Sequence, residues 1–143
     1  CGQGAVYVGS EAEVSRAVAS KPVRGSNSGT PLSASVCAAA LKLVRKNPGL
    51  CEGIRESANY LRNKLRALGL AVPETPAPIV SFSHAGFSEM RNIQEHLFYE
   101  GMYVLHSNYI ASGPGGVIRL SIFADHSVED LDRVTAAIGA ALP

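Results

Sequence analysis

The sequence has no tryptophan, few aromatic residues and no apolar run approaching the roughly 20 residues of a membrane span. Aromatic side chains make up 6% of the chain, which disfavours a platform for stacking single-stranded bases. Thirteen basic and 12 acidic residues leave a net charge of +1, too weak a field to attract nucleic acid or a membrane surface. We expect partners of neither kind.

Cysteine is also scarce. Cys1, Cys37 and Cys51 form an odd set without C-x-x-C spacing, so neither a disulfide framework nor a zinc site is predicted. The four histidines are not spaced as ligands on one helix, and we expect no metal. This cysteine usage is typical of the reducing cytosol, so a cytoplasmic protein is expected.

What the chain does have is enough apolar content for one core. With 143 residues and 46% hydrophobic content, it fits a single globular unit. It does not begin with methionine, so we expect a piece of something longer.

The most informative stretch covers residues 115–131. After Gly115-Gly116, apolar residues alternate through Phe123, as in a half-buried strand, with Arg119 on the less apolar face. Ser127 and Asp130 then predict a capping box at the start of a helix over 128–142.

The N-terminal part predicts a short strand over 5–8 and a helix over 11–19 capped by Ser10. A polar loop over 24–31 precedes a helix over 32–46, with Thr30 as cap and Pro31 in the first turn. Such a loop either binds an anion through its backbone N–H groups or is a solvated cap. Because the 32–46 helix has small side chains on all its sides, we expect it to be deeply buried, against a partner or within the chain.

A second long helix is predicted from Pro48 to a stop at Gly69, with its basic residues on a solvated face: Arg55, Arg62, Lys64 and Arg66. The later pattern predicts strands over 79–83, 102–105 and 117–123, and helices over 87–100 and 128–142. The predicted fold class is α+β, a small antiparallel sheet covered by helices on one face and preceded by two long helices.

Arg119 is the one side chain suited to gripping a carboxylate, because its fork makes two parallel charge-assisted bonds. The alternative is an ordinary arginine on a strand surface. On the residues alone, we would expect no more than an α+β binding module.

Several short motifs, taken in their order along the chain, resemble those of a known family. Residues 7–10, 26–31, 59–62, 65–69, 78–80, 100–104, 118–121, 126–127 and 130–133 carry them. In this order they resemble the C-terminal part of the pyridoxal-phosphate (PLP) α-oxoamine synthases, which include 8-amino-7-oxononanoate synthase and 2-amino-3-ketobutyrate CoA ligase. The chain departs from that family at 108–112, where a proline-containing stretch is usual, and at Val117, where a basic residue is common.

The resemblance implies a fold-type I homodimer and a small C-terminal domain that closes over the substrate. It implies that Arg119 holds the amino-acid carboxylate and that Ser26, Asn27 and Ser28 reach the cofactor phosphate of the neighbouring subunit. Residues 1–30 would be the tail of the cofactor-lysine region with the phosphate loop, and 31–143 the small domain with its leading helices. The Schiff-base lysine would lie upstream of Cys1, so no catalytic residue is expected in this chain, and the chain alone is expected to be inert.

The implied function is a fragment of a PLP-dependent acyltransferase that condenses an amino acid with an acyl-CoA and releases carbon dioxide. Two alternatives stay open: a fragment of a class I/II aminotransferase, and a non-catalytic α+β interaction module.

Overall fold

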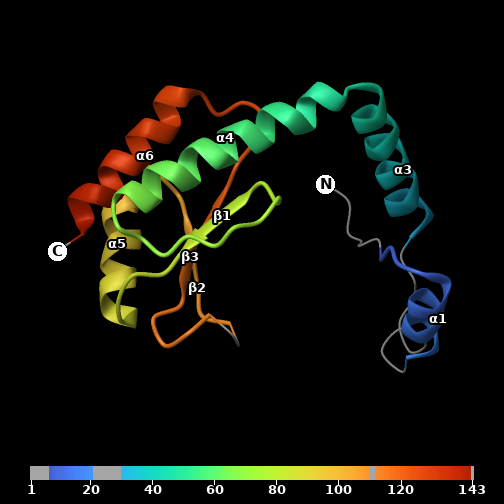
Figure 1. The fold of residues 1–143 in the computed structure, drawn as a ribbon, viewed down its shortest axis with the longest axis horizontal. Coiled ribbons are helices and arrows are strands. Elements are labelled where there is room, and N and C mark those ends of the chain that lie inside the picture. The colour runs from blue at the N-terminus through green and yellow to red at the C-terminus, as the bar shows by residue number, and fades with distance from the viewer. Residues whose placement is uncertain (1–6, 21–29, 110–111, 143) are drawn as a thin grey trace. The chain divides into compact units, whose positions relative to one another are not determined.

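A computed structural model describes residues 7–20, 30–109 and 112–142 (Figure 1). In that part the chain forms five helices and a three-stranded sheet, in two compact units, Cys1–Pro48 and Gly49–Pro143. Among these residues no helix combines the length and the apolar character needed to cross a bilayer. The prediction of a boundary near residue 30 stays a prediction.

The first unit contains helices α1 (Glu11–Ala19) and α3 (Pro31–Lys46). Ser10 caps α1 in a capping box with Glu13, whose carboxylate accepts bonds from the Ser10 hydroxyl at 2.6 Å and the Ser10 N–H at 2.8 Å. Thr30 caps α3, and Pro31 occupies its first turn, as predicted. Of the strand predicted over 5–8, residues 5 and 6 lie outside the described part, and Tyr7 and Val8 are exposed and not in a strand.

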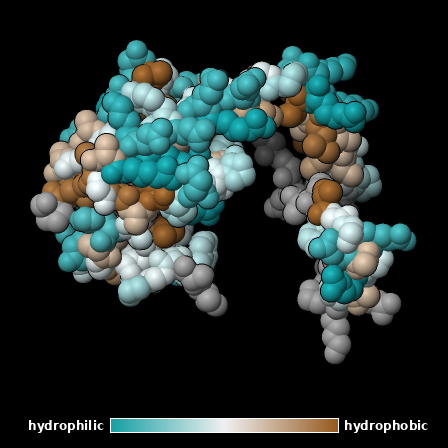
Figure 2. Space-filling model, viewed as in Figure 1, coloured by the Kyte–Doolittle hydropathy of each residue, from teal (hydrophilic) through white to brown (hydrophobic). Residues whose placement is uncertain are grey.

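The predicted burial of α3 within the chain is wrong. None of its residues is buried, and Leu32 is 74% exposed. Figure 2 shows hydrophobic residues on the surface of this helix. Small apolar side chains identify a helix that can pack closely, but the described part of this chain supplies nothing that covers it.

The second unit has the order helix, strand, helix, strand, strand, helix. Its elements are α4 (Pro48–Ala67), β1 (Ile79–Phe82), α5 (Phe87–Tyr99), β2 (Leu105–Ser107), β3 (Val117–Ser121) and α6 (Val128–Ala141). The strands lie in the order β1-β3-β2, and both pairings are antiparallel. The predicted α+β class is confirmed.

One face of the sheet carries the core. Val80, Phe82, Ile118 and Leu120 point to this face and are 0 to 7% exposed. They pack with buried side chains of the three helices: Ala58, Leu61, Leu65, Met90, Ile93, Leu97, Leu131 and Ile138. Within the second unit, the described helices therefore cover one face of the sheet, as the sequence predicts. The alternate residues of the strands lie on the opposite face, called here the open face.

The helix ends follow the predicted signals. Gly69 and Gly101 have φ of 79° and 78°, which suits glycine because it has no Cβ to clash. After each glycine the chain bonds back to the helix, from the Leu70 N–H to the Leu65 carbonyl at 3.2 Å and from the Met102 N–H to the Leu97 carbonyl at 2.8 Å. These bonds satisfy carbonyls that the helices leave free.

The strand predicted over 102–105 is displaced. β2 begins at Leu105, opposite Arg119, and ends at Ser107, opposite Val117. Residues 102–104 are apolar enough to form a strand, but they do not pair with β3, although β3 continues past Arg119 to Ser121. The predicted 117–123 strand likewise ends at Ser121.

Arg62 does not lie on a solvated face, and that prediction is wrong. It is 2% exposed and donates to the Asn59 side chain at 2.8 Å, to the Ala77 carbonyl, and weakly to the Ile79 carbonyl at 3.4 Å. Arg62 therefore ties α4 to the chain that leads into β1.

Helices α4 and α6 are joined by a polar cluster. The Tyr60 hydroxyl donates to Asp132 at 2.7 Å, and the Lys64 ammonium lies 2.9 Å from the same carboxylate. The Tyr60 hydrogen bond, followed by the Lys64 contact, lowers the pKa of Asp132, and the Asp132 carboxylate in turn raises the pKa of Lys64. Lys64 is thus engaged in holding two helices together.

Candidate functional site

Arg119 occupies the middle of β3, the central strand, and its side chain belongs to the open face. Its neighbours across the sheet are Ser81 on β1 and Leu105 on β2. No acidic residue lies opposite it in either register. Within the described part of the chain, the guanidinium of this half-buried residue makes no hydrogen bond or ion pair, so its donors are available to an anion.

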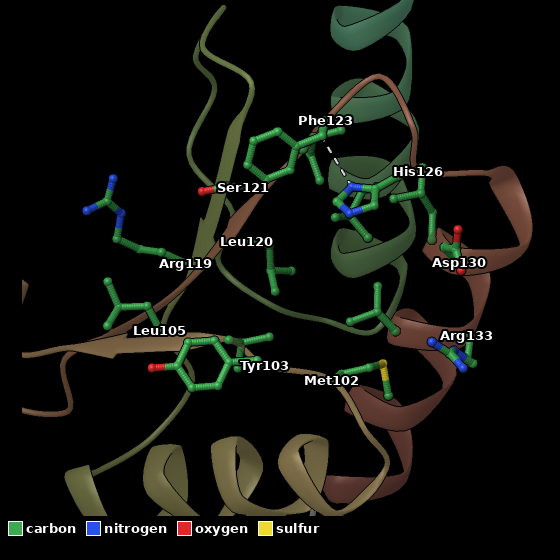
Figure 3. Close-up of a pocket in the computed structure, with 15 residues that line it drawn as sticks. Met102, Tyr103, Leu105, Arg119, Leu120, Ser121, Phe123, His126, Asp130 and Arg133 are labelled. Atoms are coloured by element: carbon green, nitrogen blue, oxygen red, sulfur yellow. Dashed lines mark hydrogen bonds between the residues drawn. The ribbon is translucent and has the colours of Figure 1, made fainter. Parts of the chain in front are cut away.

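A groove of about 500 Å³ lies beside Arg119, where β2 stops pairing with β3. Residues 102–105 form one wall, the end of β3 and the start of α6 form the other, and most of the lining is apolar. Figure 3 shows the Arg119 guanidinium pointing away from Met102, Asp130 and Arg133. Arg119 thus lies at the rim of the groove. The sequence did not predict the groove, because it arises from the early end of β2.

A glycine-rich loop leads into β3. A Cβ added to Gly115 would lie 2.0 Å from the Ala85 carbonyl oxygen, and one added to Gly116 would lie 2.6 Å from the Ser107 carbonyl oxygen. Gly116 also has a φ of 72°. The His106 ring completes the packing: its Nε2 lies 2.8 Å from the Gly115 carbonyl oxygen, and the ring contacts Phe87 in a tilted arrangement with centroids 5.0 Å apart. Close backbone packing therefore fixes the start of β3 and, with it, the position of Arg119 in the strand.

The chain after β3 is a tight turn into α6. The Phe123 N–H donates to Nδ1 of His126 at 3.3 Å, and the two rings meet edge to face at 5.6 Å (Figure 3). Ser127 and Asp130 form the predicted capping box. Hydrogen bonds from the Ser127 backbone and hydroxyl lower the pKa of Asp130. His126 is accounted for by this turn.

Of the predicted site residues, the structure describes only Arg119. Ser26, Asn27 and Ser28 lie outside the described residues. No group of three or more potential metal ligands occurs in the described ranges.

The comparisons with known proteins agree on one family. The model of the aminotransferase class I and II family matches residues 3–138. An 8-amino-7-oxononanoate synthase from Lysinibacillus sphaericus is 28% identical over 114 residues, covering 76% of this chain and 29% of that protein. An 8-amino-7-oxononanoate synthase 1 from Bacillus velezensis is 26% identical over 122 residues, covering 85% of this chain and 31% of that protein.

Solved structures place the fold in the same group. Serine palmitoyltransferase from S. paucimobilis, with bound PLP-myriocin aldimine, superposes with a TM-score of 0.57 at 26% identity, covering 63% of this chain and 23% of that one. The chain thus spans under a third of the proteins that it matches.

PLP is the cofactor of this family. Among the described residues, no lysine lines the groove beside Arg119 or the pocket beside α5, and Lys64 is paired with Asp132. These two pockets therefore do not supply the lysine that would bind PLP covalently. Sequence, fold and structural neighbours together show that this chain belongs to the aminotransferase class I and II family, on the α-oxoamine synthase side of the fold-type I PLP enzymes.

Proposed function

We propose that this chain is the C-terminal part of a cytoplasmic, homodimeric PLP enzyme that condenses an amino acid with an acyl-CoA and releases carbon dioxide. In it, Arg119 holds the carboxylate of the amino acid. The observation that carries the proposal is an arginine on the open face of the central strand, without a partner among the described residues, in a chain whose relatives are 8-amino-7-oxononanoate synthases.

The chemistry of Arg119 fits this role. A guanidinium presents two parallel N–H donors to a carboxylate, which fixes the orientation of the ligand as well as its charge. The packed glycines before β3 and the register with β1 hold the strand from which Arg119 projects. When bound, PLP would supply the electron sink for bond breaking at the α-carbon, and the covalent lysine would come from elsewhere in the enzyme, so we propose that this chain alone is inert.

The first test uses Arg119→Ala in the full-length gene product. Loss of a paired charge contact costs roughly 2 to 4 kcal/mol, so amino-acid binding should weaken roughly 30- to 1000-fold while PLP loading stays intact. Arg91→Ala is the matched control, because Arg91 is exposed and its contact with Glu95, at 2.9 Å, lies within α5. Unchanged affinity in Arg119→Ala would remove Arg119 from the site.

The family name also covers aminotransferases, which is why transamination is the second candidate. The two reactions leave different products. An oxoamine synthase releases free thiol from an acyl-CoA in the presence of the amino acid, whereas an aminotransferase consumes a keto acid and releases no thiol. Thiol release by the full-length product supports the first proposal. Its absence, together with nitrogen transfer, supports the second.

A third candidate is a non-catalytic α+β interaction module. Borohydride trapping of PLP on the full-length gene product, with peptide mapping, separates it from both enzymes. A labelled lysine upstream of Cys1 supports an enzyme, and no label supports the module.

A further inference from the structure

Ser81 lies directly opposite Arg119 in the pairing of β1 with β3. The Ile122 N–H donates to the Pro78 carbonyl at 2.9 Å, and these two residues are opposite one another in the register of β1 with β3. Hydrogen-bonded and non-hydrogen-bonded pairs alternate along an antiparallel ladder, so the Ser81–Arg119 pair is of the second kind. Side chains are closest in such pairs, with Cβ atoms roughly 4.5 to 5.5 Å apart.

The Ser81 hydroxyl is also available. Its neighbours in β1, Val80 and Phe82, are 0% and 1% exposed and point into the core, which places Ser81 on the open face with Arg119. Ser81 is half-buried, and in the described part of the chain its hydroxyl makes no hydrogen bond. Two adjacent donors on one face are thus both without a partner there.

The other neighbour of Arg119 is different in kind. Leu105, on β2, is apolar and 46% exposed. A carboxylate bound to Arg119 therefore meets a hydroxyl donor on the β1 side and a hydrocarbon surface on the β2 side. A carboxylate has about four lone-pair sites and a bidentate arginine occupies two of them, so an oxygen remains able to accept from a hydroxyl.

We propose that Ser81 is a second substrate-positioning residue, whose hydroxyl donates to the carboxylate held by Arg119 and turns the rest of the ligand toward Leu105. This inference rests on the proposed role of Arg119. It assigns to β1 a direct contact with the substrate.

The test compares Ser81→Val with Ser81→Thr in the full-length, PLP-loaded gene product. Both variants are β-branched and similar in shape, and both suit a strand, but only threonine keeps the hydroxyl. Calorimetric titration with L-alanine as the probe should show roughly tenfold weaker binding for Ser81→Val and near-normal binding for Ser81→Thr. In steady state the effect should fall on KM for the amino acid more than on kcat.

L-alaninamide and Ser83→Ala serve as controls. The amide lacks the anionic carboxylate, so Ser81→Val should not change its weaker binding. Ser83 lies on the same face but roughly 7 Å further along the chain, so Ser83→Ala should bind L-alanine normally. Normal L-alanine binding by Ser81→Val, or equal losses in Ser81→Val and Ser81→Thr, would overturn the inference.

Arg119→Ala, measured alongside, separates this inference from the proposed function. If Arg119→Ala weakens L-alanine binding and Ser81→Val does not, the Ser81 inference fails and the carboxylate site stands. If Arg119→Ala leaves binding unchanged, the proposed site fails, and Ser81 fails with it.

Discussion

Arg62 should stabilise the second unit by holding the chain that leads into β1. Replacing it with methionine keeps an apolar stem of similar length in the core but removes every donor. The Ala77 carbonyl loses a charge-assisted hydrogen bond, normally worth about 1.5 to 3 kcal/mol, and the Ile79 carbonyl loses a long and weaker one at 3.4 Å. The exposed Asn59 side chain can bond to water instead.

Relief of the cost of burying a cation opposes these losses, because no carboxylate pairs with Arg62 among the described residues. We expect Arg62→Met to lower the free energy of unfolding by roughly 1 to 3 kcal/mol, a sizeable part of the 5 to 15 kcal/mol of a typical domain. The far-UV circular dichroism signal would combine this unit with helices α1 and α3, which contain no buried residues. Amide hydrogen exchange at Val80 and Leu120, in the sheet, reports on this unit alone.

Arg55→Met is the control, since Arg55 is exposed on the same helix and should change the free energy by no more than about 0.5 kcal/mol. If the sheet amides of Arg62→Met exchanged as slowly as those of Arg55→Met, the hydrogen bonds of Arg62 would contribute nothing net to stability.

Two further predictions concern the segments that flank β3. Gly115→Ala should lower the melting temperature, because the new Cβ would lie 2.0 Å from the Ala85 carbonyl oxygen. Gly53→Ala is the control: a Cβ there has nothing within 4 Å, so this variant should raise the melting temperature slightly. Equal shifts in the two variants would contradict the close packing at Gly115. Because the Ser127 N–H and hydroxyl lower the pKa of Asp130, its carboxylate stabilises the start of α6 above about pH 4, and this contribution is lost as pH falls through the lowered value. The protection of the α6 amides, measured relative to the intrinsic exchange rate at each pH, should therefore fall in acid, and Asp130→Asn should remove most of that pH dependence. An unchanged profile in the variant would exclude Asp130 as its source.

Elements whose signals are local were predicted well. The caps at Ser10, Thr30 and Ser127 and the stop at Gly69 are all found, because each depends on residues within one helical turn. The alternation around Arg119 also placed that residue on the correct face of β3.

Features that depend on pairing were not predicted. The start of β2 is set by the partner strand, so residues 102–104 resemble a strand locally and yet leave the sheet to form one wall of the groove. Ser81 could be recognised as the neighbour of Arg119 only once the register was known, since a shift of one residue would turn it to the core.

For Arg62, helical spacing and residue type give opposite predictions of burial. Ala58, Leu61 and Leu65 form the buried stripe of α4, and Arg62, four residues after Ala58, lies on the same face by helical spacing. Spacing alone predicts burial, while residue type favours solvent. The carbonyls that accept from the guanidinium lie 15 and 17 residues away along the chain, so local spacing does not reveal them.

Arg62 and Arg119 differ in what surrounds them. Arg62 is buried and donates to three oxygens, and only its Nε lacks a partner among the described residues, so the fold accounts for most of its donors. Arg119 has a serine and a leucine opposite it, gains no cross-strand ion pair, and occupies a central position where a β-branched residue would favour the sheet more. Neither pairing nor strand propensity accounts for Arg119, and the proposed contact with a ligand carboxylate would explain why an arginine stands at this position of the open face.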